Sequence, residues 1–382
     1  MDNLTHSLVG LAASKAGLEK LSPHTSLFSV LIASAPDADI VVLLFGDRWT
    51  FLQHHRGITH SIIGTLLLGL TLPVVFYALD RLAARVRRRQ PTVKLKGLMV
   101  ASVIVCATHP ILDWTNNYGV RPFLPWSSQW FYGDFVFIID PLIWLILGGA
   151  CFLLISRTKL QMSFWLLLGG ILTFLVVAAP TQRGFESTFA IKAVWVIAMV
   201  LLIAARNLEA LSRRSRKIAT VACALVIAYM ASLAIVHHTA RAEAAVVGRS
   251  IANQNGESVT DVAAMPTLEN PTLWVCVVET ERAAYRFQIS LIRSGSVSTP
   301  IRHERADTFN SPVVNRAAQD RSAKIFLDFA RFPVARVKDE DCITQTLVQF
   351  ADLRYTEPGR ARGTFSLEVP VECPPEDAAK QK

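Results

Sequence analysis

The chain has 382 residues, of which 52% are hydrophobic and only 18% are charged. The apolar residues gather in long runs, which excludes an ordinary soluble protein and predicts a membrane protein with several spans. The net charge of +9 comes largely from basic clusters between apolar runs, so we expect no nucleic-acid partner.

Seven runs approach the length of about 20 apolar residues that crosses a bilayer. They are 27–45, 62–79, 97–112, 135–155, 164–179, 190–205 and 218–236. The segment 3–17 is a further, shorter candidate. We therefore expect a polytopic α-helical membrane protein with about 7–8 membrane helices. Its predicted parts are a helical membrane domain at 1–160, additional membrane helices at 161–238 and a soluble domain at 239–382.

Three loops are rich in lysine and arginine, and they alternate with the apolar runs. They cover 80–96, 156–161 and 206–217. Cytoplasmic loops collect basic residues, so all three are predicted to lie inside a bacterial-type inner membrane. Following the runs from these loops places the soluble domain on the extracytoplasmic side.

With this orientation, histidine and aspartate side chains from five separate segments gather at the outer membrane face. His109 and Asp113 are four residues apart, which puts them on one face of a helix. Ionisable groups in apolar segments are costly, so they indicate a functional site. Each also has a structural interpretation: Asp37 and Asp39 as helix caps after Pro36, and the 54–56 stretch as an interfacial loop.

The motifs that carry these residues resemble the YdjM-like family of membrane-bound metal-dependent hydrolases. They are MDNLTH at 1–6, PDAD at 36–39, HRGITHS at 55–61, HPILDWTNNYG at 109–119 and DFVFIIDPL at 134–142. A looser likeness in order links them to zinc-dependent phospholipase C. The resemblance implies a divalent metal, with zinc first and manganese or iron as alternatives. The implied ligands are His6, Asp37, Asp39, His55, His60, His109 and Asp113.

The same set suggests a chemistry. A bound metal would lower the pKa of water toward neutrality, and Arg56 offers a planar fork for a phosphate or carboxylate. We add Asn117 and Asp134 as candidate catalytic residues. The expected function is a metal-dependent hydrolase that acts on a phosphoester or lipid-linked envelope substrate, with membrane lipid as its partner. Two alternatives stay open: an ion or proton pathway, and a non-catalytic scaffold with a partner-binding tail.

The tail is predicted to be a small α+β or β-rich domain. A helix is expected at about 239–256, then two strands with a turn near Glu281, and further strands at 323–329, 344–348 and 364–369. If any two tail cysteines form a disulfide, we expect Cys342 and Cys373.

Overall fold

The computed structural model describes residues 1–178, 189–206, 215–268, 270–292, 296–338, 345–359 and 365–372. Two compact units make up the chain. The first holds Met1–Ile40, Arg56–Ile235 and Leu268–Pro271, and the second holds Val41–His55, Val236–Thr267 and Thr272–Lys382. The predicted disulfide partners Cys342 and Cys373 lie outside the described residues.

The first unit is helical. Its α-helices are α1 (Asn3–Ala16), α2 (Thr25–Ala33), α4 (Ile62–Val86), α5 (Leu95–Trp114), α6 (Pro141–Ile155), α7 (Lys159–Val177), α9 (Phe189–Ala205) and the first part of α11 (Ser215–Gln254). Short 3-10 helices are η1 (Leu18–Lys20), η2 (Pro36–Leu44), of which only the start belongs to this unit, and η3 (Ile58–His60).

Four of the described helices are long and apolar enough to cross a membrane: α4, α5, α7 and α11. A fifth span arises if α2 and η2, which meet at a bend of 59°, are counted together. The helices α6 and α9 are apolar but shorter. The expected class, a polytopic helical membrane protein with a C-terminal domain rich in antiparallel sheet, therefore holds, whereas the count of about 7–8 spans is not confirmed.

Helix ends explain part of the difference in span count. The run 135–155 was expected to be helical throughout, but α6 begins at Pro141 because the Asp140 carboxylate accepts the N–H groups of Leu142 and Ile143. An aspartate that caps the first turn, followed by proline at the first helical position, fixes a helix start. The remaining helix has 15 residues.

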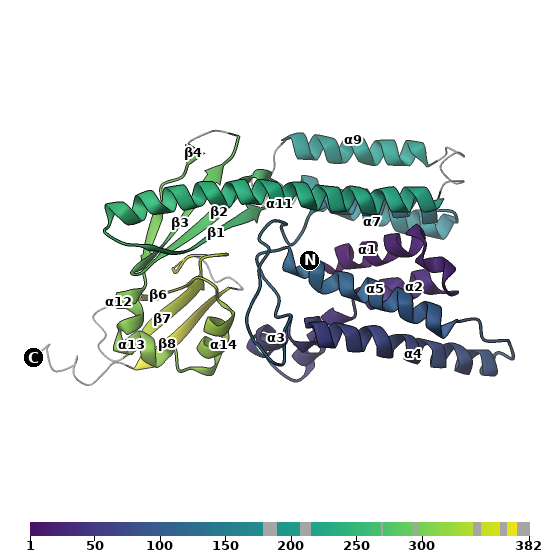
Figure 1. Ribbon diagram of the computed structural model, residues 1–382, viewed down its shortest axis with the longest axis horizontal. Helices are drawn as coiled ribbons and strands as arrows, with labels where there is room; N and C mark the ends of the chain where they lie inside the picture. The colour runs from purple at the N-terminus through teal and green to yellow at the C-terminus, as the bar shows by residue number, and fades with distance from the viewer. Residues whose placement is uncertain are drawn as a thin grey trace, which may run out of the picture. The chain divides into compact units, whose positions relative to one another are not determined.

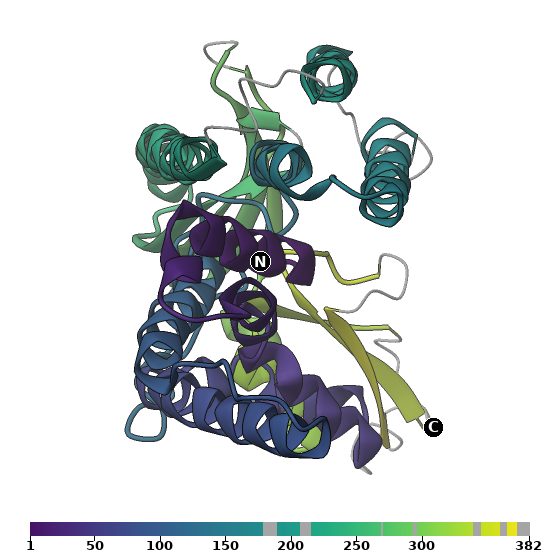
Figure 2. The same cartoon turned by 90° about the vertical axis from the view of Figure 1, so that its right-hand side faces the viewer.

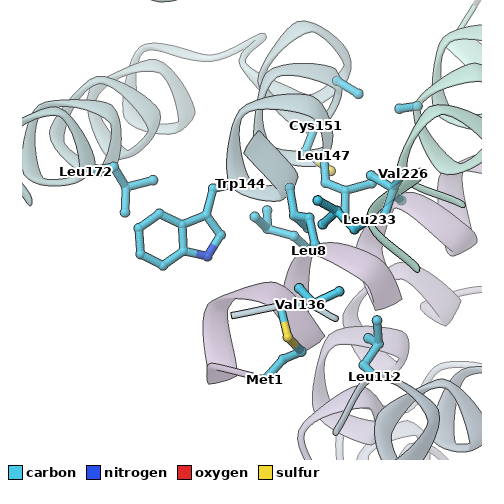
Figure 3. Close-up of a cluster of buried hydrophobic side chains, with 14 of the residues drawn as sticks. Met1, Leu8, Leu112, Val136, Trp144, Leu147, Cys151, Leu172, Val226 and Leu233 are labelled. Carbon is cyan, nitrogen blue, oxygen red and sulfur yellow. The ribbon is translucent and has the colours of Figure 1, made fainter. Parts of the chain in front are cut away.

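The helices of the first unit pack in pairs. Helices α4 and α5 run side by side, and α1 lies against α2 (Figures 1 and 2). Close approach of α1 and α2 requires Gly10, because a Cβ there would meet the Ser29 carbonyl oxygen. On its other side α1 packs on α6, where Leu8 lies near Trp144 and Leu147 (Figure 3). These contacts hold α1 in the middle of the unit.

The second unit is an α+β domain. One sheet has the order β1-β2-β3-β4, with β5 also paired to β3, and the other has the order β6-β7-β8. The strands are β1 (Val259–Thr267), β2 (Asn270–Thr280), β3 (Ala283–Ser290), β4 (Ser296–Val297), β5 (Ile301–Glu304), β6 (Pro333–Val337), β7 (Gln345–Asp352) and β8 (Ser366–Glu372). The expected turn at Glu281 joins β2 to β3, which pair antiparallel with Cys276 opposite Phe287.

Helices complete this unit. They are α3 (Arg48–His54), α12 (Ala306–Asn310), α13 (Pro312–Ala317), α14 (Arg321–Phe329) and the second part of α11. The expected helix near 239–256 is thus the end of one 40-residue helix that starts in the first unit. The strand predicted at 323–329 is wrong, because the segment forms α14. Asp320 caps this helix, and Ala323, Phe326 and Phe329 are buried at a spacing of three residues.

A buried ion pair and a buried glutamate with two hydrogen-bond donors order the second unit. Arg354 donates to Asp352 at 2.7 Å, and both side chains are fully buried. Glu257 accepts a hydrogen bond from the Thr280 hydroxyl at 2.5 Å and one from Arg302 at 3.1 Å. Burial raises the pKa of Glu257, but these hydrogen bonds outweigh it and the pKa lies below its usual range.

Candidate metal centre

Four side chains of the first unit converge on one point. Asp37 comes from η2, His60 from η3, and His109 and Asp113 from the end of α5, and each offers an atom within 4.8 Å of the others. The Nε2 atom of His60 lies 3.3 Å from an oxygen of Asp37 and 3.3 Å from one of Asp113. The Nε2 atom of His109 lies 3.5 Å from each of the same two oxygens. We call these four residues the His–Asp cluster.

The hydrogen bonds of the two imidazoles show which nitrogens face the centre. His109 Nδ1 lies 2.6 Å from the Ala33 carbonyl oxygen, which can only accept, so Nδ1 carries a proton and Nε2 is the nitrogen that faces the cluster. His60 Nδ1 lies 3.0 Å from the Thr59 hydroxyl and 3.6 Å from Asp39. Its Nε2 therefore points inward as well, 3.1 Å from that of His109.

This close approach of two ring nitrogens requires something positive between them. Two lone pairs at this distance, flanked by two carboxylates, repel each other unless a proton or a cation is shared. Two imidazole nitrogens and two carboxylate oxygens form a donor set that suits zinc, manganese or iron. A metal-bound histidine usually donates its other N–H to a carbonyl or carboxylate, as His109 does here. The residues present thus fit a divalent metal.

Local structure explains how separate segments reach the cluster. The chain bends between α2 and η2, which starts at Pro36; the bend leaves the Ala33 carbonyl free for His109 and places Asp37 in the first turn of η2. The spacing of His109 and Asp113 is one helical turn. His60 ends η3, whose last turn packs so closely on Gly64 that a Cβ there would collide with the Ile58 carbonyl.

His6 lies directly against the cluster. Its ring stacks on that of His109 with centroids 3.7 Å apart, and its Nε2 lies 3.4 Å from an oxygen of Asp113. Neither ring nitrogen has a hydrogen-bond partner among the described residues, although the side chain is buried. Helix α1, which carries His6, has 14 residues and is too short to cross a bilayer. Burial of the His6 side chain lowers its pKa to about 3. His6 is therefore neutral, the form that binds a metal. The amino group of Met1 also contacts Asp113.

Arg56 holds the cluster from one side. Its Nη2 donates to Asp113 at 3.1 Å, and its Nη1 donates to Asn116 Oδ1 at 2.9 Å and to the Gly119 carbonyl at 3.1 Å. Its backbone N–H donates to Asp39 at 3.1 Å. The residue is buried and its φ of 51° lies in the left-handed region. Arg56 is thus tied to Asp113 and to the loop that follows α5.

The other predicted residues take different places. Asn117 and Asp134 are buried in the loop after α5, and Asp134 has a φ of 60°. His55 belongs to the second unit, where it ends α3 and stacks on Phe51 with ring centroids 4.6 Å apart. The contacts of the Ala33 carbonyl and the Met1 amino group could not be predicted, because backbone groups leave no signal in a side-chain pattern.

Comparisons with known proteins agree with the motifs. Residues 1–183 match the family model described as YdjM inner membrane protein. The chain is 26% identical over 155 residues to the uncharacterized protein YfhP of Bacillus subtilis, a match covering 38% of this chain and 43% of that protein. It is 27% identical over 132 residues to the inner membrane protein YbcI of Escherichia coli, covering 34% of this chain and 70% of that one.

The chain thus spans less than half the length of the first of these relatives. No solved structure matches the chain, and the looser likeness to zinc-dependent phospholipase C has no support in these comparisons. The family match covers α1 to α7 and therefore includes the whole His–Asp cluster. Four of the described helices are long and apolar enough to cross a membrane. Residues 1–183 therefore match the YdjM inner membrane protein family, and this match together with the apolar helices supports a multi-pass location in the inner membrane.

Proposed function

We propose that the first unit is a membrane-embedded, metal-dependent hydrolase of phosphoesters, with zinc as the first candidate for the metal. The observation that carries the proposal is the pair of Nε2 atoms of His60 and His109, which face each other at 3.1 Å between two carboxylates. Asp37, His60, His109 and Asp113 would hold the ion. His6 supplies a further neutral imidazole at its edge.

The chemistry of such a centre suits hydrolysis. A bound divalent ion lowers the pKa of a water molecule toward neutrality and stabilises negative charge on a phosphoryl oxygen. The protein contributes a rigid donor set, because the Ala33 carbonyl fixes the His109 ring and Arg56 fixes Asp113. Asp37 is the cluster member whose side chain is partly exposed, at 15%, so water would approach from its side.

Arg56 has a positioning role in this proposal. Both of its terminal nitrogens donate to protein acceptors, and its guanidinium lies over the Tyr118 ring at 4.5 Å. A guanidinium used in this way holds the Asp113 carboxylate in place and offsets its charge. The geometry favours this role over the direct phosphate contact expected from the sequence.

The decisive experiment is metal analysis of the full chain purified in detergent, together with matched histidine variants. Wild type is expected to carry a divalent metal and to hydrolyse p-nitrophenyl phosphodiesters, and His60→Ala is expected to lose both. His54→Ala is the control, because His54 belongs to the same stretch of sequence but is exposed at the end of α3. Metal-free wild-type protein would contradict the proposal and leave a shared proton between His60 and His109 as the explanation.

We also propose that the cluster and the second unit lie on the extracytoplasmic side of the inner membrane. The support is the basic segment made by the last turns of α4, with arginines at 81 and 85, and the loop to α5, with arginines at 87, 88 and 89. Reporter fusions after residues 90 and 245 are expected to be active in the cytoplasm and periplasm, respectively. Periplasmic activity from both fusions would refute this orientation and, with it, an envelope substrate.

A further inference from the structure

A groove of about 270 Å³ begins at the His–Asp cluster. The start of α4, the last turn of α5 and the loop 120–131 line it, with His60, Ile62, Ile111, Trp114, Phe123 and Phe131 among the lining residues. His60 is the polar member of this lining, and its Nε2 belongs to the cluster. The groove therefore places an apolar surface directly beside one buried imidazole of the candidate metal centre.

The rim of the groove is unusually apolar for a surface in contact with water. Ile62, Ile111 and Trp114 are 62%, 58% and 41% exposed, and Phe123 is also exposed. Both helices that carry the first three residues are candidate membrane spans. Along the same helices the apolar surface continues through Leu66 and Ile104. This continuity indicates that the groove opens toward hydrocarbon instead of water.

We infer that the groove binds the hydrocarbon chain of a phosphate-bearing membrane amphiphile, with the phosphate reaching the His–Asp cluster past His60. The inference rests on the proposed hydrolase function and names its substrate class. Pockets for complete small ligands measure about 300–1,000 Å³. This groove is slightly smaller, so it holds part of one chain while the remainder stays in the bilayer.

The geometry explains why the substrate would be an amphiphile. A water-soluble phosphoester would gain nothing from the exposed faces of Ile111 and Trp114, whereas an alkyl chain would bury them. An amphiphile in the groove presents its polar end at the one polar lining residue.

The first test measures chain selectivity. Ile111→Trp fills the groove, and Ile104→Trp is the matched control, since Ile104 lies two helical turns earlier on α5, is 48% exposed and does not line the groove. The readout is the ratio of kcat/KM for long-chain to short-chain p-nitrophenyl alkyl phosphodiesters. Ile111→Trp is expected to lower this ratio by about tenfold or more, and Ile104→Trp to leave it unchanged. Equal ratios in wild type and Ile111→Trp would overturn the inference.

The second test needs no turnover and separates the groove from the metal. A bromoalkyl phosphate is titrated into metal-loaded protein, and quenching of tryptophan fluorescence is compared with that of Trp114→Phe. The inference predicts saturable quenching that Trp114→Phe removes, that chelation weakens, and that the matching bromoalkyl alcohol does not reproduce. If the protein binds metal and hydrolyses phosphodiesters but shows no such quenching, hydrocarbon binding in the groove is refuted and the proposed hydrolase function stands. Metal-free wild-type protein would refute the proposed function, and quenching equal for phosphate and alcohol would refute the headgroup assignment.

Discussion

Asp39 can be used to test how the His–Asp cluster is held together, because its carboxylate lies next to His60, one of the four cluster residues. Its carboxylate accepts the Arg56 backbone N–H at 3.1 Å and lies 3.6 Å from His60 Nδ1. Asp39→Asn keeps the size of the side chain and an oxygen that can accept the Arg56 N–H. It removes the negative charge that favours a proton on Nδ1 and thereby a lone pair on Nε2.

The expected magnitude follows from this geometry. Removing a group that orients a metal-bound histidine typically weakens metal affinity 10- to 100-fold. The distance of 3.6 Å is long for a hydrogen bond, and the Thr59 hydroxyl also approaches His60 Nδ1 at 3.0 Å. We therefore expect the lower end, about tenfold, which corresponds to about 1.4 kcal/mol of binding free energy. Asp113→Asn removes a ligand and is expected to lose far more.

The assay is a competition titration of metal-stripped protein against a chromophoric chelator in detergent. Wild type, Asp39→Asn, Thr59→Val and Asp113→Asn are compared at matched purity, with Asp47→Asn as a control because Asp47 is an exposed cap of α3. Loss of affinity in Thr59→Val but not in Asp39→Asn would show that the hydroxyl orients His60. Equal affinity in all variants would refute the cluster as the binding site.

Three further outcomes are expected. Gly64→Ala forces a Cβ against the Ile58 carbonyl and should displace η3, lowering metal stoichiometry in correctly inserted protein, which metal analysis against expression level measures. Arg354→Ala leaves Asp352 buried without its partner and should cost about 3–5 kcal/mol of unfolding free energy, measured by chemical denaturation of the second unit's signal. The pKa of Glu257 is depressed, so its contribution is present above its unfolded-state pKa and is lost as pH falls through the folded value. Glu257→Gln should flatten this acid dependence, and an unchanged pH profile would contradict the assignment.

Much of the cluster could be predicted because its signals are local. His109 and Asp113 are one turn apart in a helical run, and such a spacing guarantees a shared face wherever the helix lies. Asp37 and His60 were candidates for a different reason, since polar residues in apolar surroundings need a partner. Their meeting with His109 depends on the bend between α2 and η2, whose angle no periodicity encodes.

Other features could not be predicted from the sequence, for physical reasons. The acceptors of Arg56 could not be predicted, because Asp113, Asn116 and the Gly119 carbonyl become its neighbours only after folding. The short stretch 323–329 is apolar at positions that suit either a strand or a helix, and the cap at Asp320 decides for α14. The expected number of spans is not confirmed in the described residues, partly because hydropathy does not reveal where a cap such as Asp140 starts a helix.

The bend after Ala33 also has a consequence for how the protein is made. Each aspartate in the middle of a membrane segment opposes insertion by about 2.5–3.5 kcal/mol. Asp37 and Asp39 both lie in the bent pair α2–η2, while the histidines that contact Asp37 come from η3 and α5, which are synthesised later. The pair is therefore poorly suited to enter the bilayer alone and becomes stable there only once α5 has arrived. In a series of truncated chains, stable membrane integration of α2–η2 should appear only when residue 114 has been included. During biogenesis, formation of the His–Asp cluster would then be the step that stabilises the bent pair α2–η2 in the membrane.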